Sequence, residues 1–377
     1  MSFSTVVVVG VGLIGGSFAA ALKRLEPAPR VYGIDTEPAA LDWAVAHGIL
    51  DAGAVPGTSG ASEWLGPHGG ELVVLATPAA RVVEWIEHLG RSGFGGVVTD
   101  VASTKTGIIR AAERHLSGSA RFVGGHPMAG SERSGVEAAD AALFQGAYYV
   151  LTPTPETDLA AYREVHALVS ALGCRVVSVA PEEHDEAVAV VSHVPHVAAS
   201  ALVSVAVARA GNDGELLRLA AGGFKDTTRV AAGSPELWTG ICMDNAAAVS
   251  DGVDELRRTL GDFVTMLRHG DANAVQSWLA RAADVRRSLP AQWVPATTAL
   301  TEVSVPMVDR PGVIAQITTA ASRAGCNIEA IEIEHLSESS ARLVMVLTDE
   351  GDIARFIDEV RAAGHAPQVR PLDAVGE

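Results

Sequence analysis

The first 180 or so residues alternate short, continuously apolar runs with amphipathic stretches. Continuous apolar runs are typical of strands buried on both faces, and amphipathic stretches between them are typical of helices that cover a sheet. The pattern therefore predicts an α/β domain with a doubly wound, mainly parallel sheet. The predicted strands are 5–9, 30–34, 72–75, 96–99, 121–123, 148–151 and 175–179, and the predicted helices include 13–25, 38–47, 81–89 and 159–172.

The pattern changes at about residue 181, and from there to about residue 289 the chain reads as helices. The clearest predicted helix begins with Ser234 as N-cap and Pro235 at the first helical position. It could run to His269, with Gly270 as its stop. Its apolar residues are spaced alternately by fours and threes, which is typical of a seam that packs on another helix. They are Val249, Val253, Leu256, Leu260, Phe263 and Leu267.

A second stretch of this region, 187–208, has no charged residue. It is long enough to cross a bilayer, so a membrane helix is one interpretation. Its polar residues favour a buried helix of a soluble protein, and we predict no membrane span. Two such apolar helices need more cover than this small region supplies, so we expect it to form a homodimer. The stretch contains the polar residues Ser192, His193, His196, Ser200 and Ser204, and also Pro195.

The C-terminal part returns to alternating strands and helices after a predicted linker, 290–298, which contains Pro290 and Pro295. The expected order βαββαβ is that of a ferredoxin-like unit. The predicted domains are therefore 1–180, 181–289 and 299–377. The predicted elements of the last domain are strand 300–307, helix 313–324, strands 327–334 and 341–347, helix 352–363 and strand 367–369.

Composition narrows the function classes. The chain has 377 residues with 28 Lys and Arg against 45 Asp and Glu, a formal net charge of −17, which disfavours binding to nucleic-acid phosphates. An apolar share of 48% excludes global disorder. Three cysteines lie far apart in sequence and provide no disulfide framework, which suits a reducing cytoplasm. No signal peptide is recognised ahead of the first strand, so we expect a cytoplasmic protein.

A glycine-rich turn follows the first predicted strand. Gly10, Gly12 and Gly15 form a GxGxxG pattern at the start of a helix, where backbone N–H groups can face a pyrophosphate. Asp35 ends the second strand and can accept hydrogen bonds from ribose hydroxyls, and the absence of Lys or Arg just after it favours NAD over NADP. A turn of a flavodoxin-like fold is the alternative. The predicted cofactor contacts are Gly10, Gly12, Leu13, Ile14, Gly15, Asp35, Thr77, Pro78 and Asp100.

Polar clusters follow two later strands, at 99–105 and 124–130. The second contains His126, which we expect on a loop because glycines precede it and a proline follows. Removing hydride from a carbinol carbon requires the hydroxyl proton to leave, and histidine is the usual acceptor near neutral pH. Ser103 of the first cluster could orient this imidazole. A loop histidine with a purely structural hydrogen bond is the alternative.

The helical region adds two further candidates. His193 and His196 are three residues apart, but no Cys, Asp or Glu stands at ligand spacing beside them, so we predict no metal site. Arg229 follows a polar, glycine-rich run and could bind a substrate carboxylate through its guanidinium. A solvated arginine at a helix end is the alternative.

Taken together, these motifs resemble the prephenate and arogenate dehydrogenase family of tyrosine biosynthesis. The resemblance covers nearly the whole chain, because five motifs stand in the family's order. They are GVGLIGGS at 10–17, TDVASTK at 99–105, GGHPMAGSERSG at 124–135, SHVPH at 192–196 and GGFKDTTR at 222–229, followed by Trp238.

The resemblance implies NAD-dependent oxidative decarboxylation of prephenate to 4-hydroxyphenylpyruvate, with arogenate as the alternative substrate. It implies that His126 is the catalytic histidine and that Ser103 hydrogen-bonds it. It further implies a carboxylate-binding role for Arg229. The other implied substrate-binding residues are His196, Gly222 and Trp238.

The C-terminal unit resembles an ACT domain, which implies an aromatic amino-acid effector such as tyrosine. The candidate regulatory residues are Asp309, Gly312, Asn327 and Ile328. A degenerate domain used only for assembly is the alternative. Two other functions stay open at this point: another dehydrogenase with an ACT unit, such as a homoserine dehydrogenase, and an NAD-sensing regulator on a retired dehydrogenase fold.

Overall fold

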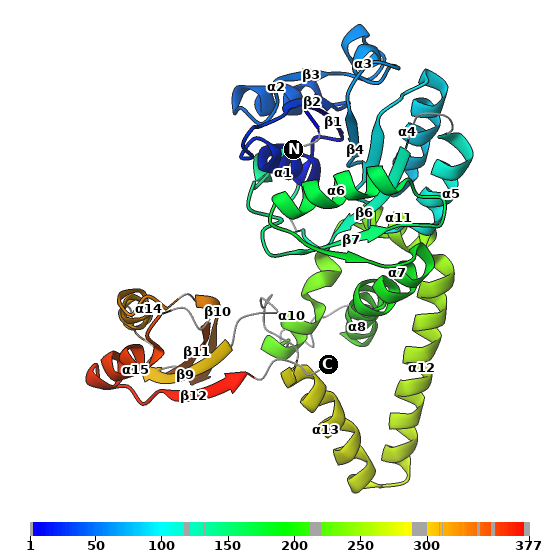
Figure 1. Cartoon of the computed structure of the whole chain (residues 1–377). Helices are drawn as coiled ribbons and strands as arrows, with labels where there is room; N and C mark the ends of the chain where they lie inside the picture. Colours follow the sequence, from blue (N-terminus) through cyan, green and yellow to red (C-terminus); the bar gives the residue numbers. More distant parts are fainter. Residues whose placement is uncertain are drawn as a thin grey trace. The chain divides into compact units, whose positions relative to one another are not determined.

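The computed structural model describes residues 3–116, 121–130, 133–210, 220–288, 300–308, 310, 312–326, 328–337, 340–347 and 351–372. The chain divides into two compact units, Met1–Thr265 and Met266–Glu377, and each is described by itself. Figure 1 shows the elements of both. The predicted linker 290–298 lies outside the described residues.

The first unit contains an eight-stranded sheet in the order β3-β2-β1-β4-β5-β6-β7-β8. Neighbouring strands are parallel except β6 and β7, which are antiparallel. The doubly wound sheet predicted from the apolar runs is therefore confirmed. The strands are β1 (Thr5–Val9), β2 (Arg30–Ile34), β3 (Ala52–Ala54), β4 (Leu72–Leu75), β5 (Val97–Asp100), β6 (Arg121–Pro127), β7 (Tyr148–Thr152) and β8 (Arg175–Ser178).

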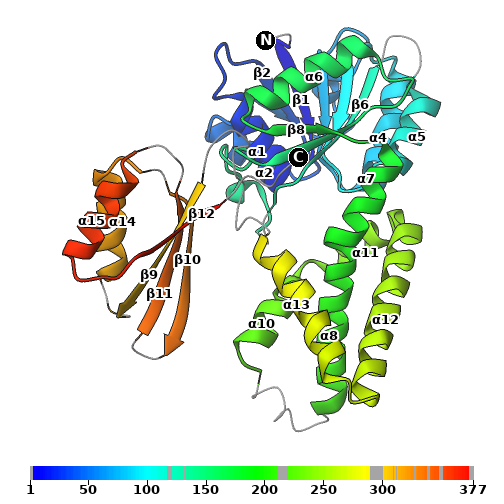
Figure 2. The same cartoon turned by 60° about the horizontal axis from the view of Figure 1, so that its bottom comes forward.

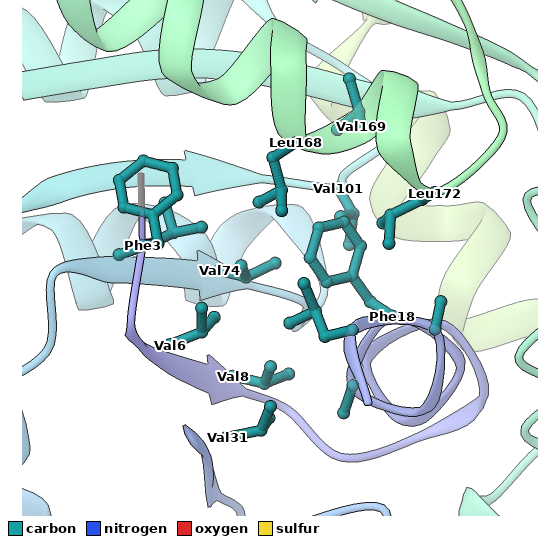
Figure 3. Packing of buried hydrophobic residues seen from close by; sticks show 14 of the residues in the cluster. Phe3, Val6, Val8, Phe18, Val31, Val74, Val101, Leu168, Val169 and Leu172 are labelled. Carbon is teal, nitrogen blue, oxygen red and sulfur yellow. The ribbon is translucent and has the colours of Figure 1, made fainter. Parts of the chain in front are cut away.

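Helices pack on both faces of this sheet, which explains why its strands are continuously apolar. On one face Val6 and Val8 of β1 pack with Phe18 of α1 and Leu168 of α6 (Figure 3). On the other face Val7 of β1 belongs to a core with residues of α3, α4 and α5. The helices are α1 (Leu13–Leu22), α2 (Pro38–Ala46), α3 (Ser59–Trp64), α4 (Ala79–Ser92), α5 (Thr106–His115) and α6 (Leu159–Ala171).

The helical region begins with a nearly continuous rod formed by α7, a π-helical segment (η2) and α8. The single helix predicted from Ser234 to His269 is wrong, because the chain breaks at Asn245 between α11 and α12. The Asn245 side chain instead donates to the backbone oxygen of Asp185 at 2.7 Å. The elements are α7 (Pro181–Val188), η2 (Ala189–His193), α8 (Val194–Ala210), α10 (Gly222–Thr228), η4 (Arg229–Ala232), α11 (Pro235–Asp244) and α12 (Ala246–Arg268).

Within the described residues, Pro181–Ala210 is the one helical stretch long and apolar enough to cross a membrane by length and composition. It nevertheless carries His193 and His196, which are buried against neighbouring protein. Several of its apolar side chains, including Val191 and Val205, are exposed in the single chain. Such a face is consistent with a helix covered by another protein surface.

The second unit contains α13 (Ala272–Ser288) and a four-stranded antiparallel sheet in the order β10-β11-β9-β12. Helices α14 and α15 lie on the same face of this sheet (Figure 2). The predicted βαββαβ order is confirmed. Its elements are β9 (Leu300–Val308), α14 (Val313–Arg323), β10 (Ile328–Ser337), β11 (Ser340–Leu347), α15 (Ile353–Ala362) and β12 (Gln368–Leu372).

Candidate active site

The glycine-rich turn between β1 and α1 leaves room for a ligand. Gly10 has a φ of +92°, and a Cβ there would lie 2.6 Å from the backbone oxygen of Ala76, so only glycine fits. A Cβ on Gly15 would lie 1.9 Å from the backbone oxygen of Gly10, which shows how closely helix and turn pack. A Cβ on Gly12, in contrast, would meet open space. The turn therefore fits the pyrophosphate of a dinucleotide.

Two side chains beside this turn offer further polar contacts. Asp35 accepts hydrogen bonds from the backbone N–H of Val11 at 2.6 Å and of Glu37 at 3.0 Å, which holds its carboxylate against the turn. Thr77 follows β4, and its buried hydroxyl has no hydrogen-bond partner among the described residues. Both groups suit a nucleotide.

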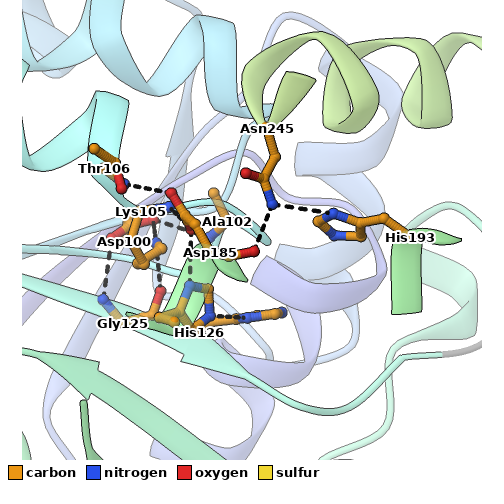
Figure 4. A network of polar contacts seen from close by, with 10 residues as sticks. Asp100, Ala102, Lys105, Thr106, Gly125, His126, Asp185, His193 and Asn245 are labelled. Atoms are coloured by element: carbon orange, nitrogen blue, oxygen red, sulfur yellow. Dashed lines mark hydrogen bonds and ion pairs between the residues drawn. The ribbon is translucent and has the colours of Figure 1, made fainter. Parts of the chain in front are cut away.

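Asp100 and Lys105 form a fully buried ion pair at the end of β5. Asp100 accepts a hydrogen bond from the backbone N–H of Gly125 at 3.1 Å, and Lys105 donates to the backbone oxygen of Gly125 at 2.7 Å (Figure 4). Asp100 also accepts from the N–H of Ala102. We predicted that Asp100 contacts the cofactor, but its carboxylate is fully buried and engaged by these groups. The pair holds both backbone polar groups of Gly125, the residue before His126, and the cofactor contact of Asp100 stays a prediction.

His126 lies within β6, opposite Val150 of β7, and not on a loop as its glycine and proline neighbours suggested. The strand continues through the glycines because β7 supplies antiparallel hydrogen-bonding partners. The imidazole is 9% exposed. Burial is the largest cause that holds the pKa of His126 well below 6.5, and the charge of Lys105 adds to it. His126 is therefore a neutral imidazole near pH 7 and can accept a proton.

Two neighbours of His126 were missed by the sequence reasoning. His126 Nδ1 lies 2.8 Å from His184 Nε2, and His184 Nδ1 lies 2.9 Å from Asp185 Oδ1. The available signal was a His-Asp pair at the start of a helix that directly follows strand β8. Among the described residues, no hydrogen bond joins Ser103 to His126, so the predicted role of Ser103 stays a prediction.

The helical region contributes a second group of predicted residues. His196 stacks on Trp238, with ring centroids 3.6 Å apart and an angle of 14° between the rings. Burial lowers the pKa of His196, and its Nδ1 is buried without a partner in the described part of the chain. Trp238 also meets His193 edge-on, and His193 contributes to the low pKa of His126. His193 Nδ1 also lies 3.4 Å from Asn245 Nδ2, and Asn245 donates to the backbone oxygen of Asp185.

Arg229 and Gly222 lie beside α8, the helix that carries His196. Gly222 begins α10 and Arg229 begins η4, and both of these elements contact α8. Both residues are exposed, and Arg229 forms no ion pair within the described ranges. A guanidinium in this state is available to a carboxylate ligand.

Of the four predicted regulatory residues, the structure describes only Gly312 and Ile328. In the second unit, Gly312 has a φ of +93° and caps α14, and Ile328 begins β10. Asp309 and Asn327 lie outside the described residues. No group of three or more His, Cys, Asp or Glu in the described part of the chain could hold a metal ion.

A dinucleotide turn after β1 and a neutral, buried histidine near the carboxyl end of β6, in the same sheet, define an NAD-dependent dehydrogenase. The comparisons with known proteins narrow this class. The chain belongs to the prephenate dehydrogenase family. Residues 18–178 match its nucleotide-binding domain, residues 180–281 its dimerization domain, and residues 301–365 the ACT domain. The exact domain boundaries that we predicted stay predictions.

Similar proteins span most of the chain. The prephenate dehydrogenase of Bacillus subtilis (strain 168) is 36% identical over 95% of this chain and 96% of its own length. A crystal structure of prephenate dehydrogenase from A. aeolicus, in complex with hydroxyphenyl propionate and NAD+, covers 77% of this chain and 99% of that one, with 32% identity and a TM-score of 0.72. A crystal structure of Synechocystis arogenate dehydrogenase is 31% identical, with a TM-score of 0.64, over 75% of this chain and 98% of that one.

Proposed function

We propose that this protein oxidises prephenate with NAD and releases CO₂ and 4-hydroxyphenylpyruvate. The observation that carries the proposal is the neutral, buried His126 on β6. Bound NAD would supply the acceptor for the hydride that leaves C4 of the substrate ring. His126 takes the proton of the hydroxyl on the same carbon, so that a carbonyl develops there. Loss of the ring carboxylate as CO₂ then makes the ring aromatic.

The glycine-rich turn between β1 and α1 indicates how the predicted residues would bind the cofactor. The N-terminus of α1 and the open space beside Gly12 would receive the pyrophosphate. Asp35 would accept hydrogen bonds from the adenosine ribose. The residues that follow Asp35, Thr36 to Pro38, carry no cation to receive a 2′-phosphate, which supports NAD over NADP. Leu13, Ile14, Thr77 and Pro78 would line the same site.

Arg229 would hold the carboxylate on the substrate ring, with Gly222, His196 and Trp238 lining the pocket. A stacked His196–Trp238 pair is a flat, mostly apolar wall that suits a cyclohexadiene ring. Arg229 must bind the carboxylate without stabilising it so strongly that CO₂ cannot leave. Ser103 would supply a second hydrogen bond at the reacting hydroxyl or at His126.

The direct test is an initial-rate assay with two substrates and two cofactors. We expect fast NADH formation with prephenate and NAD, and much slower rates with arogenate or with NADP. Higher kcat/KM with arogenate would change the proposed substrate, since arogenate carries an ammonium where prephenate carries a ketone. Absence of NAD reduction with both substrates would refute the proposed function.

The low pKa of His126 predicts how kcat/KM for prephenate depends on pH below neutrality. A base acts only when unprotonated, so kcat/KM falls when the pH drops through the pKa of His126. Because burial, Lys105, His184 and His193 lower that pKa and Asp185 only partly opposes them, we expect kcat/KM for prephenate to stay constant from neutral pH down to 6.5. A decline centred at or above pH 6.5 would contradict this assignment.

Arg229→Lys tests the carboxylate-binding role. Lysine keeps the charge but cannot make a bidentate contact, so we expect KM for prephenate to rise by about 10-fold to 100-fold, while KM for NAD is unchanged. Steady-state kinetics measure both constants. Arg209→Lys, a change at the end of α8 outside the proposed pocket, is the matched control. An unchanged KM for prephenate would remove Arg229 from the site.

The other assignments concern assembly and regulation. We propose a cytoplasmic homodimer formed through the helical domain, with the exposed apolar side chains of η2 and α8 at the interface. We further propose that tyrosine binds the ACT domain near Gly312 and inhibits. Tyrosine is expected to lower the NAD-linked rate and to raise the melting temperature. If it changes neither, the regulatory proposal is wrong.

A further inference from the structure

Three side chains form a line of hydrogen bonds that ends at the proposed catalytic base. Asp185 and His184 are neighbours at the start of α7, and His126 comes from β6. The line runs from Asp185 Oδ1 to His184 Nδ1 at 2.9 Å, and from His184 Nε2 to His126 Nδ1 at 2.8 Å. All three are buried, with 6%, 2% and 9% of their surfaces exposed. Water therefore has little access to these bonds.

We propose that Asp185 and His184 are positioning residues that fix His126 in the tautomer with its proton on Nδ1, so that Nε2 carries the lone pair that receives the substrate's proton. This inference rests on the proposed function, because it assigns a direction to the base of that reaction. Neither Asp185 nor His184 needs to touch the substrate for this role.

The tautomers follow from the order of donors and acceptors. An ionised carboxylate only accepts hydrogen bonds, so His184 Nδ1 must donate to Asp185. With the His184 proton placed on Nδ1 by Asp185, the proposal assigns Nε2 of His184 as the acceptor of the next hydrogen bond. His126 Nδ1 must therefore donate to it, and the neutral His126 ring is left with an unprotonated Nε2. The logic is that of a catalytic histidine whose tautomer is set by a carboxylate, with a second imidazole inserted between the two.

Asp185 is held so that it remains a fixed acceptor. Its two carboxylate oxygens accept hydrogen bonds from the backbone N–H groups of Lys105 and Thr106, both at 2.8 Å, at the start of α5. These bonds and the one from His184 lower the pKa of Asp185 against the opposing effect of burial. Asn245 donates to its backbone oxygen. The break between α11 and α12 thus contributes to holding this residue.

The surroundings of His126, burial first among them, also oppose its protonation in the resting protein. Lys105 lies beside it with its partner Asp100, and both are fully buried. His184 and His193 face it from α7 and η2, and the pKa of His193 is lowered by burial. Asp185 is the nearby group that favours a proton on His126. Through the line of hydrogen bonds, the Asp185 carboxylate also determines which ring nitrogen of His126 stays unprotonated.

The test is long-range ¹H–¹⁵N NMR of the full-length protein labelled at histidine nitrogens, which distinguishes protons on Nδ1 and on Nε2. Loss of signals in His126→Asn and His184→Gln assigns the two rings. We expect both rings to carry a proton on Nδ1 near pH 7, and Nε2 of His126 to carry none. A proton on Nε2 of His126 would overturn the proposal, and this result depends only on the assignment from His126→Asn.

Kinetics of His184→Gln provide the second measurement. Glutamine can donate or accept, so it no longer selects the tautomer, and we expect kcat with prephenate to fall by about 10-fold to 100-fold with KM for NAD unchanged. His166→Gln, the same change on α6, is the control. Unchanged kcat in His184→Gln would overturn the proposal. If the unmodified protein does not oxidise prephenate at all, the proposed function fails, while the NMR result still decides the tautomer.

Discussion

Replacing His126 with asparagine is expected to lower kcat with prephenate by a factor of about 10² to 10⁴, which is the usual contribution of a positioned general base. Asparagine fits the volume of the site and can still accept a hydrogen bond, but it cannot take up a proton near pH 7. The measurement is the steady-state rate of NADH formation at saturating prephenate and NAD.

Binding of NAD separates loss of chemistry from loss of the fold. His126 lies on β6, whereas the glycine-rich turn lies between β1 and α1, so titration calorimetry should give the same Kd for NAD in His126→Asn and in the unmodified protein. His88→Asn, on the exposed surface of α4, should leave both constants unchanged. Near-normal turnover in His126→Asn would remove the histidine from the mechanism.

Replacing Lys105 with methionine is expected to cost about 3–5 kcal/mol of unfolding free energy. The ammonium of Lys105 is fully buried, and its removal leaves the Asp100 carboxylate buried without its cation. It also removes the hydrogen bond to the backbone oxygen of Gly125. Methionine keeps the volume of the side chain while the charge disappears, so the loss reports on the ion pair and the hydrogen bond. Urea denaturation followed by circular dichroism measures this loss.

Lys23→Met provides the matched control, since Lys23 pairs with Asp51 at 2.7 Å with both side chains partly exposed. Exposed or partly exposed pairs are worth about 0–1 kcal/mol, so the control should lose far less stability than Lys105→Met. Equal losses in unfolding free energy would mean that the buried Lys105–Asp100 pair stabilises the fold no more than the partly exposed Lys23–Asp51 pair. The same Lys105 variant should also displace His126, because Gly125 is the preceding residue.

The sequence was sufficient for most of the architecture because its signals are local. The predicted bounds of β1 and β4 match the observed ones, because both strands are buried in the sheet and their apolar runs are continuous. The glycine pattern at Gly10–Gly15 predicts the turn between β1 and α1, and the structure shows that a Cβ at Gly10 or Gly15 would clash with backbone atoms. The order of the C-terminal unit was readable for the same reason.

The errors arise where tertiary contacts override local patterns. The pattern around His126 suggests a loop, but pairing with β7 extends β6 through Gly124 and Gly125. The heptad-like spacing after Ser234 cannot reveal a break at Asn245, which exists because its side chain reaches Asp185, 60 residues away in the chain. His184 and Asp185 were missed for a related reason. Their importance depends on contacts with β6 and α5 that no local spacing encodes.

In the proposed reaction, this chain couples hydride transfer from C4 of prephenate to NAD with decarboxylation. The most direct measurement uses prephenate carrying deuterium at C4 and follows both products by mass spectrometry. We expect deuterium in the reduced cofactor, and CO₂ and 4-hydroxyphenylpyruvate formed in equal amounts with it. Reduced cofactor without deuterium, or reduction of NAD without release of CO₂, would contradict it.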